Sequence, residues 1–401
     1  MRPDPPDVAA FQPREPIGLY IHVPFCTAKC DYCGFFSVPA PSRETVSAVL
    51  EATVRDAAEM LTRLGRPPVR SVYIGGGSPS ILTPGELLRL GEGVARSCGQ
   101  TQFEEWTVEA NPDTITGPWV DALSDLPVTR VSVGVQSFSH SVRSEIGRRG
   151  GLPSTHAALE LLRSRGRHAL GIDLLAGCPA QSADRLLADL RAALFYTPEH
   201  VSLYPLSLEP GTPLAERVHA GRARIASDEA TVSAVERARR MLADAHILRY
   251  ELSNYAKPGY ECRHNDTYWC LEPYLGVGPG AVSTLPAGDG TALRLESSTD
   301  VEMFLRAEDG LARRKSETVE RRSFILEHFM MGLRRTAGVP ASRMVERFGA
   351  APRSFAPKAV ERWEAAGLLE ANGEDLSMTA GGTWFVDTFL REIAAELSGA
   401  G

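Results

Sequence analysis

The chain has 401 residues, of which 43% are hydrophobic and 23% are charged. This is the composition of an ordinary globular protein, and it excludes a disordered, collagen-like or coiled-coil chain. The net charge is −7, and no segment concentrates Lys and Arg as nucleic-acid-binding surfaces do, so we expect no nucleic-acid partner.

The first twenty residues are rich in proline and carry acidic groups, unlike the cationic and then apolar run of a secretory signal. No window approaches about 18 consecutive apolar residues, so no membrane span is expected. We therefore expect a cytoplasmic protein. In such a protein, clustered cysteines bind metal more often than they form disulfides.

Short β-rich runs alternate with longer segments of helical period, which is typical of a parallel βα architecture. After a proline-rich leader over 1–17, strands are predicted over 18–23, 70–74, 105–110, 130–135, 169–175 and 200–205. Residues 42–64 repeat apolar side chains at helical spacing, and each remaining gap is long enough for a crossover helix. Because such crossovers are right-handed, we expect these units to curl into a barrel or partial barrel over 18–215.

The pattern changes after residue 215, and a connecting region is expected over 216–315. There the sequence predicts a helix over 228–245, a strand over 249–252 and an irregular stretch rich in Gly, Pro and aromatic residues over 254–284. The last segment, 316–401, predicts helices over 316–332, 342–348 and 356–366, then a hairpin turning at Asn372-Gly373. This order resembles a winged-helix module. The charges of its third helix cancel, which favours a structural or partner-binding cap over a DNA reader.

Three cysteines directly after the first predicted strand carry the strongest local signal. Cys26, Cys30 and Cys33 are spaced C-x3-C-x2-C. A structural zinc site uses four protein ligands, one more than this loop offers. A [4Fe–4S] cluster held by three cysteines leaves one iron open to a non-protein ligand, as a reactive cluster requires. The loop follows the first predicted strand, and catalytic groups collect at the carboxyl ends of barrel strands. Its position and its three cysteines together favour a reactive cluster with an open iron.

These residues resemble the signature of radical S-adenosylmethionine (SAM) enzymes. The flanking sequence resembles the subgroup of oxygen-independent coproporphyrinogen III oxidases, HemW-type heme chaperones and class C methyltransferases, through SVYIGGGSPS, VEANPDTIT, RVSVGVQSF, GIDLLAG and YLGVGPGA. The resemblance implies an α/β fold, a partial (β/α)6 barrel of radical SAM type with a C-terminal winged-helix-like α+β cap. It also implies SAM on the open iron and a reducing partner such as flavodoxin or ferredoxin.

Polar side chains and three adjacent glycines follow the predicted strands, where SAM contacts would lie. Adjacent glycines let the backbone approach a ligand, although they also suit a tight turn, and an acid such as Glu109 can instead cap the next helix. The resemblance implies that Glu109 and Gln136 bind the methionine and ribose parts, Asp173 the ribose hydroxyls and Arg148 the SAM carboxylate. The implied cofactor-binding residues are Tyr20, Gly75, Gly76, Gly77, Ser78, Glu109, Gln136, Arg148 and Asp173.

Two further residues have open interpretations. Some members of the subgroup bind a second SAM, and Tyr32, inside the cysteine loop, is the residue we expect beside it in a catalytic role. The segment H-N-x-x-Y-W from His264 resembles a motif associated with heme in the chaperones, so His264 is a candidate heme ligand. A histidine in an aromatic, glycine-rich bend can equally be a structural group with both nitrogens satisfied.

Departures from the chaperone pattern decide between the activities. The pattern CDFN is CGFF here, with Gly34 and Phe36; GPGAH is GPGAV, with Val282; and GLPGQ is GCPAQ, with Ala180. An apolar mouth disfavours a carboxylate-bearing tetrapyrrole, because desolvating a carboxylate costs several kcal/mol. We therefore expect a class C methyltransferase that uses two SAM on an sp2 carbon of a heteroaromatic or polycyclic substrate, either a small molecule or peptide-borne.

The alternatives are a heme chaperone, which would bind heme, and a coproporphyrinogen III oxidase. The oxidase pattern has a further cysteine two positions after the third, where this chain has Phe35, so the oxidase is the less favoured of the two.

Overall fold

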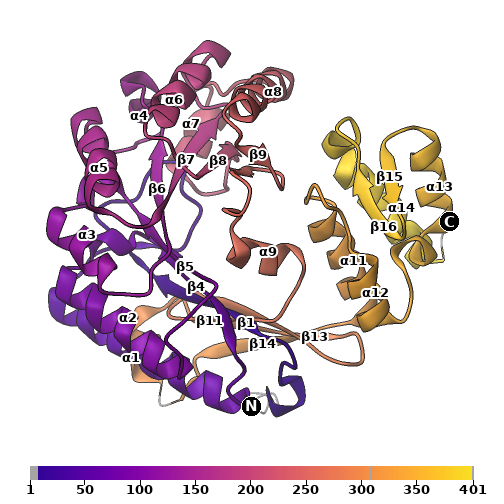
Figure 1. Ribbon diagram of the computed structural model, residues 1–401, viewed down its shortest axis with the longest axis horizontal. Helices are drawn as coiled ribbons and strands as arrows, with labels where there is room; N and C mark the ends of the chain where they lie inside the picture. Colours follow the sequence, from indigo (N-terminus) through magenta and orange to yellow (C-terminus); the bar gives the residue numbers. More distant parts are fainter. Residues whose placement is uncertain (1–7, 308, 400–401) are drawn as a thin grey trace.

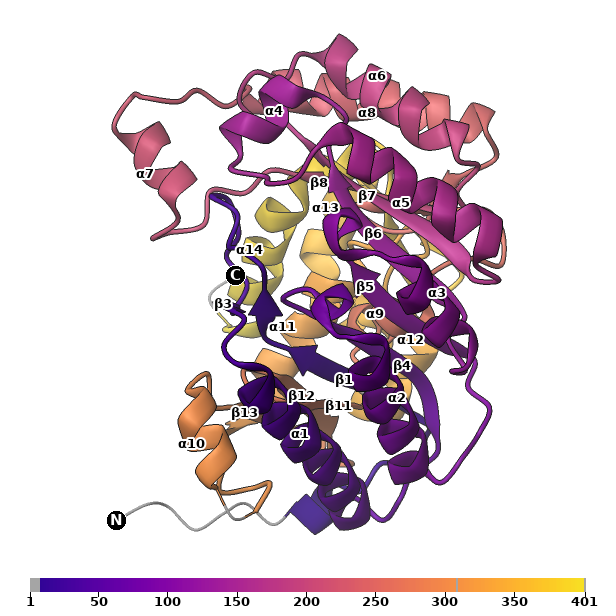
Figure 2. The ribbon, with the colours of Figure 1, turned by 90° about the vertical axis from the view of Figure 1, so that its left-hand side faces the viewer.

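A twelve-stranded sheet organises the computed structural model, which describes residues 8–307 and 309–399. Six parallel strands lie at its centre in chain order, with helices on their outer side (Figures 1 and 2). These strands are β1 (Ile17–Val23), β4 (Val69–Gly76), β5 (Glu105–Ala110), β6 (Arg130–Gln136), β7 (Ala169–Ala176) and β8 (His200–Pro205). Each begins and ends within two residues of its predicted bounds. The expected α/β partial (β/α)6 barrel is confirmed.

The crossovers contribute the helices that cover the barrel, which are α1 (Arg43–Arg63), α2 (Pro84–Cys98), α3 (Gly117–Ser124), α4 (His140–Glu145), α5 (Leu152–Arg165) and α6 (Ala183–Phe195). After β8 follow α7 (Pro213–His219) and α8 (Asp228–Asp244), of which α8 packs against α6. Local sequence sets several of their ends. For example, α2 begins at a capping box in which Thr83 and Glu86 each bond the other's backbone N–H, and it ends at Gly99 in the left-handed conformation.

Further strands extend both edges of the parallel sheet. β11 (Tyr274–Val277) pairs parallel with β1, and antiparallel β12 (Val282–Pro286), β13 (Ala292–Ser297) and β14 (Arg314–Val319) follow it. At the other edge, β10 (Asn254–Ala256) and β9 (Leu248–Arg249) follow β8. The remaining short elements of this part are β2 (Phe25–Cys26), β3 (Val38–Pro39), α9 (Arg263–Trp269), α10 (Val301–Arg306) and the 3-10 turns at Val8–Phe11, Pro79–Ile81 and Pro112–Thr114.

The prediction of an irregular stretch over 254–284 is wrong, because this stretch contains β10, α9 and β11. These elements are three to seven residues long, too short to show a periodicity in sequence. A helix as short as α9 is held by tertiary contacts rather than by helix propensity. The strand predicted over 249–252 is also wrong beyond Arg249, where β9 ends. Of the expected leader over 1–17, residues 1–7 lie outside the described part.

The C-terminal region packs around its own hydrophobic core, which includes Phe324, Trp363 and Phe389. Its elements are α11 (Arg321–Gly332), α12 (Ala341–Phe348), α13 (Pro357–Ala365), the hairpin β15 (Leu369–Asn372) and β16 (Asp375–Met378), α14 (Val386–Leu397) and the 3-10 turns at Pro352–Phe355 and Gly382–Phe385. Three helices followed by a hairpin agree with the winged-helix-like expectation, and α14 was not predicted. The helix expected from residue 316 is wrong at its start, where residues up to 319 belong to β14.

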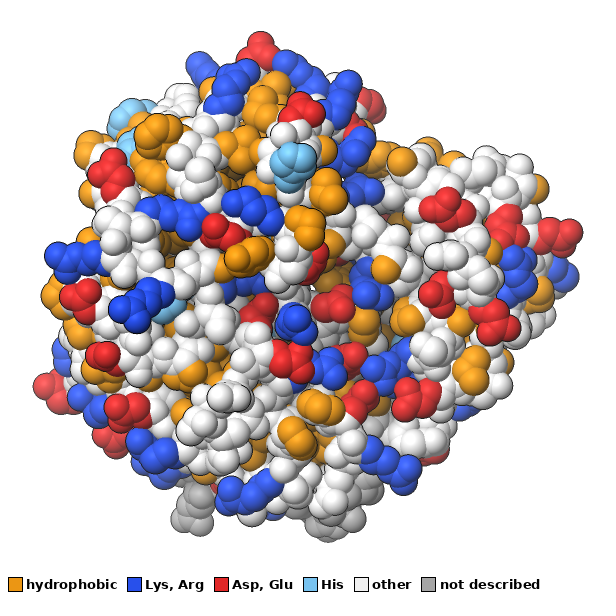
Figure 3. Space-filling model, in the orientation of Figure 1, with side chains coloured by type: hydrophobic (Ala, Val, Ile, Leu, Met, Phe, Trp, Pro, Cys, Tyr) orange, Lys and Arg blue, Asp and Glu red, His pale blue; other side chains and the backbone are white. Residues whose placement is uncertain are grey.

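The surface of this chain mixes charges of both signs. Figure 3 shows Lys and Arg side chains interspersed with Asp and Glu over one face. On α13, Arg362 pairs with Glu392 of α14, and Glu364 pairs with Arg353. Among the helices of the described residues, none combines the length and apolarity that a membrane crossing requires.

Ala180 adopts the left-handed conformation, with φ +57°, in the turn after β7 where the chaperone pattern has glycine. A residue with a Cβ loses about 1–2 kcal/mol there, while glycine adds about 0.4–1 kcal/mol of unfolded-state entropy to overcome. We expect Ala180→Gly to raise the free energy of unfolding by about 0.5–1 kcal/mol, measured by urea denaturation. Ala188→Gly, at an exposed position inside α6, is the matched control and should lower it by about 1 kcal/mol. A loss of stability in Ala180→Gly would contradict this account.

Candidate active site

The cysteine loop lies at the carboxyl-terminal end of the barrel strands, directly after β1. Its ends are held together by the β2–β3 ladder, in which Cys26 pairs with Pro39. Inside the loop the backbone N–H of Cys33 donates to the carbonyl of Cys30 at 3.2 Å. On its outer side the carbonyl of Asp31 accepts from the N–H of Leu214 in α7, which Figure 2 shows set apart from the other helices. The loop is therefore held at its ends by the β2–β3 ladder, internally by the hydrogen bond between Cys33 and Cys30, and by the contact with α7.

The three thiols of the loop are the predicted ligands of an iron–sulfur cluster. All are free and half-buried, and burial together with the neighbouring thiols raises the pKa of Cys26 and of Cys33. A structural zinc site takes four protein ligands, whereas a [4Fe–4S] cluster held by three cysteines takes each thiolate on a different iron. Three free thiols on one loop are therefore the ligands that the predicted [4Fe–4S] site requires.

Arg148 brings a positive charge to the cysteine loop. Its Nη1 donates to Cys30 Sγ at 3.6 Å, and its Nη2 donates to Asn111 Oδ1 at 3.1 Å and to the carbonyl of Gly134. The Nε atom is buried, with no partner among the described residues. The Nε–H of this guanidinium is therefore an unused donor beside the cysteine loop. An unused cationic donor fits the predicted role of Arg148 toward the SAM carboxylate.

Glu109 lies at the end of β5 and faces the barrel interior. It accepts hydrogen bonds from the hydroxyl of Tyr73 at 2.7 Å and from the N–H of Gly76 at 3.1 Å. Burial raises the pKa of Glu109 to about 7, and the nearby Asp173 adds to this rise. The carboxyl group does not cap the following helix, so the capping interpretation fails. Tyr73 was missed, although its alternation with Ser71 and Gly75 along β4 places it on the same face.

Gln136 and Asp173 lie on β6 and β7, the two strands that follow the strand of Glu109 in the sheet. Gln136 has φ +70°, at the register shift that ends β6. Such a backbone costs about 1–3 kcal/mol and persists mostly at functional sites. Asp173 accepts from the hydroxyl of Ser132 at 3.1 and 3.2 Å, and burial raises its pKa. The structure therefore brings Glu109, Gln136, Arg148 and Asp173 to the same end of the barrel.

The glycine segment is explained first by packing. A Cβ on Gly75 would lie 2.8 Å from Glu109 Oε2, one on Gly76 2.5 Å from the His22 ring, and one on Gly77 2.5 Å from the Phe25 carbonyl. The N–H groups of Gly77 and Ser78 donate to the carbonyls of Val23 and Phe25, and that of Gly76 donates to Glu109. These N–H groups are engaged within the protein, so a ligand here would be held through acceptor groups.

Tyr20 and His22 face inward from β1. The Tyr20 hydroxyl bonds His22 Nδ1 at 2.9 Å, and His22 Nε2 bonds the carbonyl of Phe36 at 3.0 Å. The Phe36 ring stacks on His22 at 5.9 Å and lies against Gly280. Phe36 therefore joins the cysteine loop to the GPGA turn. His22 was missed by the sequence analysis, although it shares the inner face of β1 with Tyr20.

Tyr32 packs beneath the cysteine loop. It is half-buried against the hydrophobic cluster that contains Val142, Ile146 and Leu214, and burial raises its pKa. This packing gives Tyr32 an anchoring role in the loop, and a catalytic role beside a second SAM stays a prediction.

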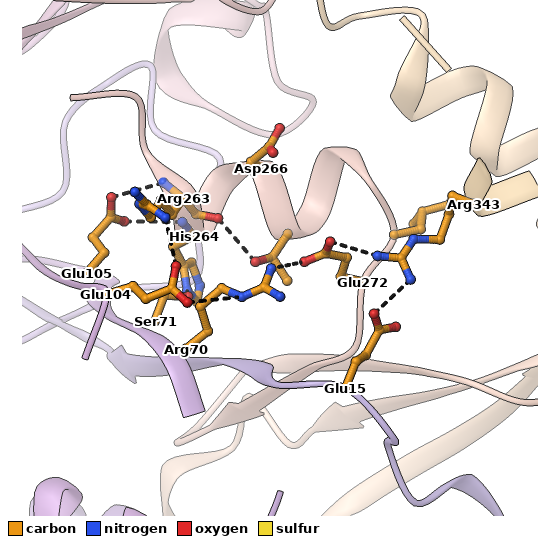
Figure 4. A network of polar contacts seen from close by, with 12 residues as sticks. Glu15, Arg70, Ser71, Glu104, Glu105, Arg263, His264, Asp266, Glu272 and Arg343 are labelled. Atoms are coloured by element: carbon orange, nitrogen blue, oxygen red, sulfur yellow. Dashed lines mark hydrogen bonds and ion pairs between the residues drawn. The ribbon is translucent and has the colours of Figure 1, made fainter. Parts of the chain in front are cut away.

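His264 lies in α9, in the core of the barrel near Tyr73 and Tyr20. Its side chain is completely buried, and Nδ1 is bonded to Ser71 Oγ at 2.9 Å (Figure 4). Its Nε2 is bonded to Tyr268 OH at 2.7 Å. Burial lowers the pKa of His264 to about 4, so the ring is neutral at pH 7. Both ring nitrogens are committed to the protein, and in this arrangement neither is available to a heme iron. The structural interpretation describes His264 better than the heme-ligand one.

Replacing Asp173 with alanine is expected to weaken SAM binding about tenfold or more, because the predicted buried acceptor of the ribose hydroxyls is lost. The cluster should be intact, since Asp173 has no contact with the cysteines. Equilibrium dialysis of cluster-loaded protein, with iron analysis, measures both. Asp184→Ala, an exposed carboxylate on α6, is the matched control and should bind as the unaltered chain does. Unchanged affinity in Asp173→Ala would remove this residue from the site.

Comparisons with known proteins show the family to which the chain is similar. A model of the Radical SAM superfamily matches residues 20–193, and one of the HemN C-terminal domain matches residues 319–385. The heme chaperone HemW of Escherichia coli is 31% identical over 385 residues, covering 95% of this chain and 99% of the relative. HemW of Bacillus subtilis is 30% identical over 361 residues, covering 90% and 94%.

A solved structure shares the fold. Coproporphyrinogen III oxidase (HemN) from Escherichia coli, described as a radical SAM enzyme, superposes with a TM-score of 0.77, covering 96% of this chain and 92% of that one. Its sequence identity of 19% supports the likeness in fold alone.

Proposed function

The chain belongs to the HemN/HemW family of the radical SAM superfamily, and from that premise we propose that it is a radical SAM protein that binds and delivers heme. The observation that carries this proposal is the full-length similarity to proteins named heme chaperone HemW. In the Escherichia coli relative, the match covers 99% of the length, so the cysteine loop, the barrel and the C-terminal region all take part.

The comparisons favour the heme chaperone over the class C methyltransferase that the sequence analysis preferred. That preference rested on an apolar mouth at Gly34, Phe36 and Val282. In the structure, Phe36 is committed to His22 and Gly280. A Cβ on Gly34 would lie 2.6 Å from Glu209, so Gly34 accommodates a neighbouring side chain. These two substitutions repack the loop and are weak evidence about the substrate.

In the proposed function, different residues of this chain would bind the cluster and the parts of SAM. Cys26, Cys30 and Cys33 would hold the [4Fe–4S] cluster, and cluster and SAM together supply reductive cleavage of SAM when bound. Arg148 would offer a cationic donor to a carboxylate, and Glu109 would offer an acceptor to the N–H of an amino group. Asp173 would accept from the ribose hydroxyls, and Gln136 would bind the methionine and ribose parts together with Glu109. The electron would come from a reducing partner such as a flavodoxin or ferredoxin.

A hemin titration of the anaerobic, cluster-loaded protein tests the proposal. We expect a stable Soret band that saturates near one heme per chain and elutes with the protein in gel filtration. His264→Gln should keep this band, because both nitrogens of His264 are bonded within the core. The absence of a stable Soret band in the unaltered chain would reject heme binding.

The methyltransferase stays a second candidate because Val282 replaces the imidazole of the chaperone pattern. A methyltransferase of this class would convert one SAM to S-adenosylhomocysteine for each SAM cleaved to 5′-deoxyadenosine. With reductant and hemin, the heme chaperone is expected to form little or no S-adenosylhomocysteine. Near-equal amounts of the two products would favour the methyltransferase instead.

A further inference from the structure

Three inward-facing residues of β4 form a line along the barrel interior. Side chains alternate along a strand, so Ser71, Tyr73 and Gly75 share the inner face, in that order toward the cluster end. Ser71 Oγ bonds His264, and the Tyr73 hydroxyl donates to Glu109 Oε1 at 2.7 Å. Gly75 leaves the space that the Glu109 carboxylate occupies. This line connects α9 to the predicted SAM site.

The ring of Tyr73 stacks against the imidazole ring of His264. The two rings stack with centroids 5.2 Å apart and an interplanar angle of 28°. His264 itself is fixed by hydrogen bonds at both nitrogens, to Ser71 and Tyr268. Because His264 is neutral, this contact adds no charge near the carboxylate. The stack fixes the plane of the Tyr73 ring, and from this position its hydroxyl donates to Glu109.

The position of α9 is fixed by the barrel. Glu105 accepts from the N–H groups of Arg263 and His264 at 2.9 and 3.2 Å and from Cys262 Sγ at 3.2 Å (Figure 4). On its other side, Asp266 of α9 pairs with Arg335 at 2.9 Å. The helix is therefore a rigid support for His264 and Tyr73.

We propose that Tyr73 is a positioning residue of the SAM site, whose hydroxyl orients the Glu109 carboxylate while His264 fixes the Tyr73 ring. The proposal rests on the SAM-binding role of Glu109 in the proposed function. In this proposal the H-N-x-x-Y-W helix supports SAM binding indirectly. Its His264 lies in the core and holds the Tyr73 ring, and Tyr73 in turn orients Glu109.

The electrostatics of Glu109 give the proposal a measurable consequence. Burial raises the pKa of Glu109, and the hydrogen bonds from Tyr73 and Gly76 lower it. Losing the Tyr73 donor therefore raises this pKa further. A neutral carboxyl accepts a hydrogen bond from the amino group of SAM less strongly than a carboxylate does, so affinity should fall as pH falls through the pKa. The titratable groups that face Glu109 are Tyr20 of β1, Tyr73 of β4, Asp173 of β7, Tyr204 of β8 and Tyr268 of α9.

The test measures the dissociation constant of SAM against pH, by equilibrium dialysis of anaerobic cluster-loaded protein. In Tyr73→Phe, the pH at which affinity declines should rise by about one unit, which makes binding about tenfold weaker on the acidic side. The substitution keeps the ring and its stack. Tyr274→Phe is the matched control, since this buried hydroxyl accepts from Thr284 at 2.9 Å and does not contact Glu109. It should leave the pH profile unchanged.

Two results would overturn the inference. One is a pH profile for Tyr73→Phe that coincides with that of the unaltered protein. The other is a loss of affinity that is equal at every pH, as a general packing defect would cause. Glu109→Gln separates this failure from failure of the assigned site: it should bind weakly without the pH dependence, and unchanged binding would remove Glu109 from the SAM site altogether.

Discussion

Replacing Cys30 with alanine is expected to reduce the iron of the anaerobically reconstituted protein from about four atoms per chain to a small residual fraction. Cys30 is the middle thiol of the loop and the one that Arg148 contacts, at 3.6 Å. With three thiolates already the minimum for a cluster with an open iron, two are insufficient to hold it. Iron and sulfide analysis, together with the visible absorption of the cluster, measures the loss.

Cys98→Ala is the matched control for this variant. Cys98 is also free and half-buried, but it ends α2 on the outside of the barrel. We expect its iron content to equal that of the unaltered chain. Tightly bound zinc with no iron after anaerobic expression, or full iron in Cys30→Ala, would contradict the assignment of the loop.

Replacing Glu105 with alanine is expected to lower the free energy of unfolding by about 3–5 kcal/mol, because it breaks a buried ion pair. Glu105 and Arg130 are each 5% exposed, with 2.8 Å between Oε2 and Nη2. The substitution leaves the Arg130 charge uncompensated and removes the acceptor for the first N–H groups of α9. The shift of the urea midpoint, followed by tryptophan fluorescence, measures the loss.

The pH dependence of this contribution has a definite sign. Burial alone would raise the pKa of Glu105, but the charge and hydrogen bond of Arg130 lower it overall. The contribution is therefore complete above the unfolded-state pKa of about 4.3 and disappears as pH falls through the lower folded pKa. Glu92→Gln is the control: its pair with Arg96 is exposed and should be worth about 0.5 kcal/mol or less. A cost below about 1 kcal/mol for Glu105→Ala would contradict the buried-pair account.

The barrel could be predicted from sequence because each of its strands is a short β-rich run that ends near turn residues, and longer segments separate the runs. In β1, Leu19, Ile21 and Val23 are buried, and the flanking helix α1 shows its apolar stripe over many turns. The same reasoning failed for α9. Its seven residues contain polar and aromatic side chains, and the contacts that hold it come from Glu105, more than 150 residues away in the chain.

The sequence predicted those residues of the candidate site that stand at strand ends, and it missed those whose role depends on long-range contacts. Polar side chains at the ends of apolar strands, such as Glu109 and Asp173, stand out in sequence and meet at one end of the barrel. The roles of Tyr73 and His264 depend on a hydrogen bond and a ring stack between distant segments, which spacing along the chain does not encode. Phe36 was given a functional interpretation, yet its contacts with His22 and Gly280 are those of a packing residue.

The central claim is that three cysteines hold a cluster whose remaining iron is open to SAM at the end of this barrel. Electron paramagnetic resonance of the reduced cluster, recorded with and without SAM, tests it most directly. The account predicts that SAM changes the spectrum of the unaltered protein and that Asp173→Ala needs a higher SAM concentration for the same change. A cluster spectrum that is indifferent to saturating SAM would show that no iron is open to it, and would contradict the account.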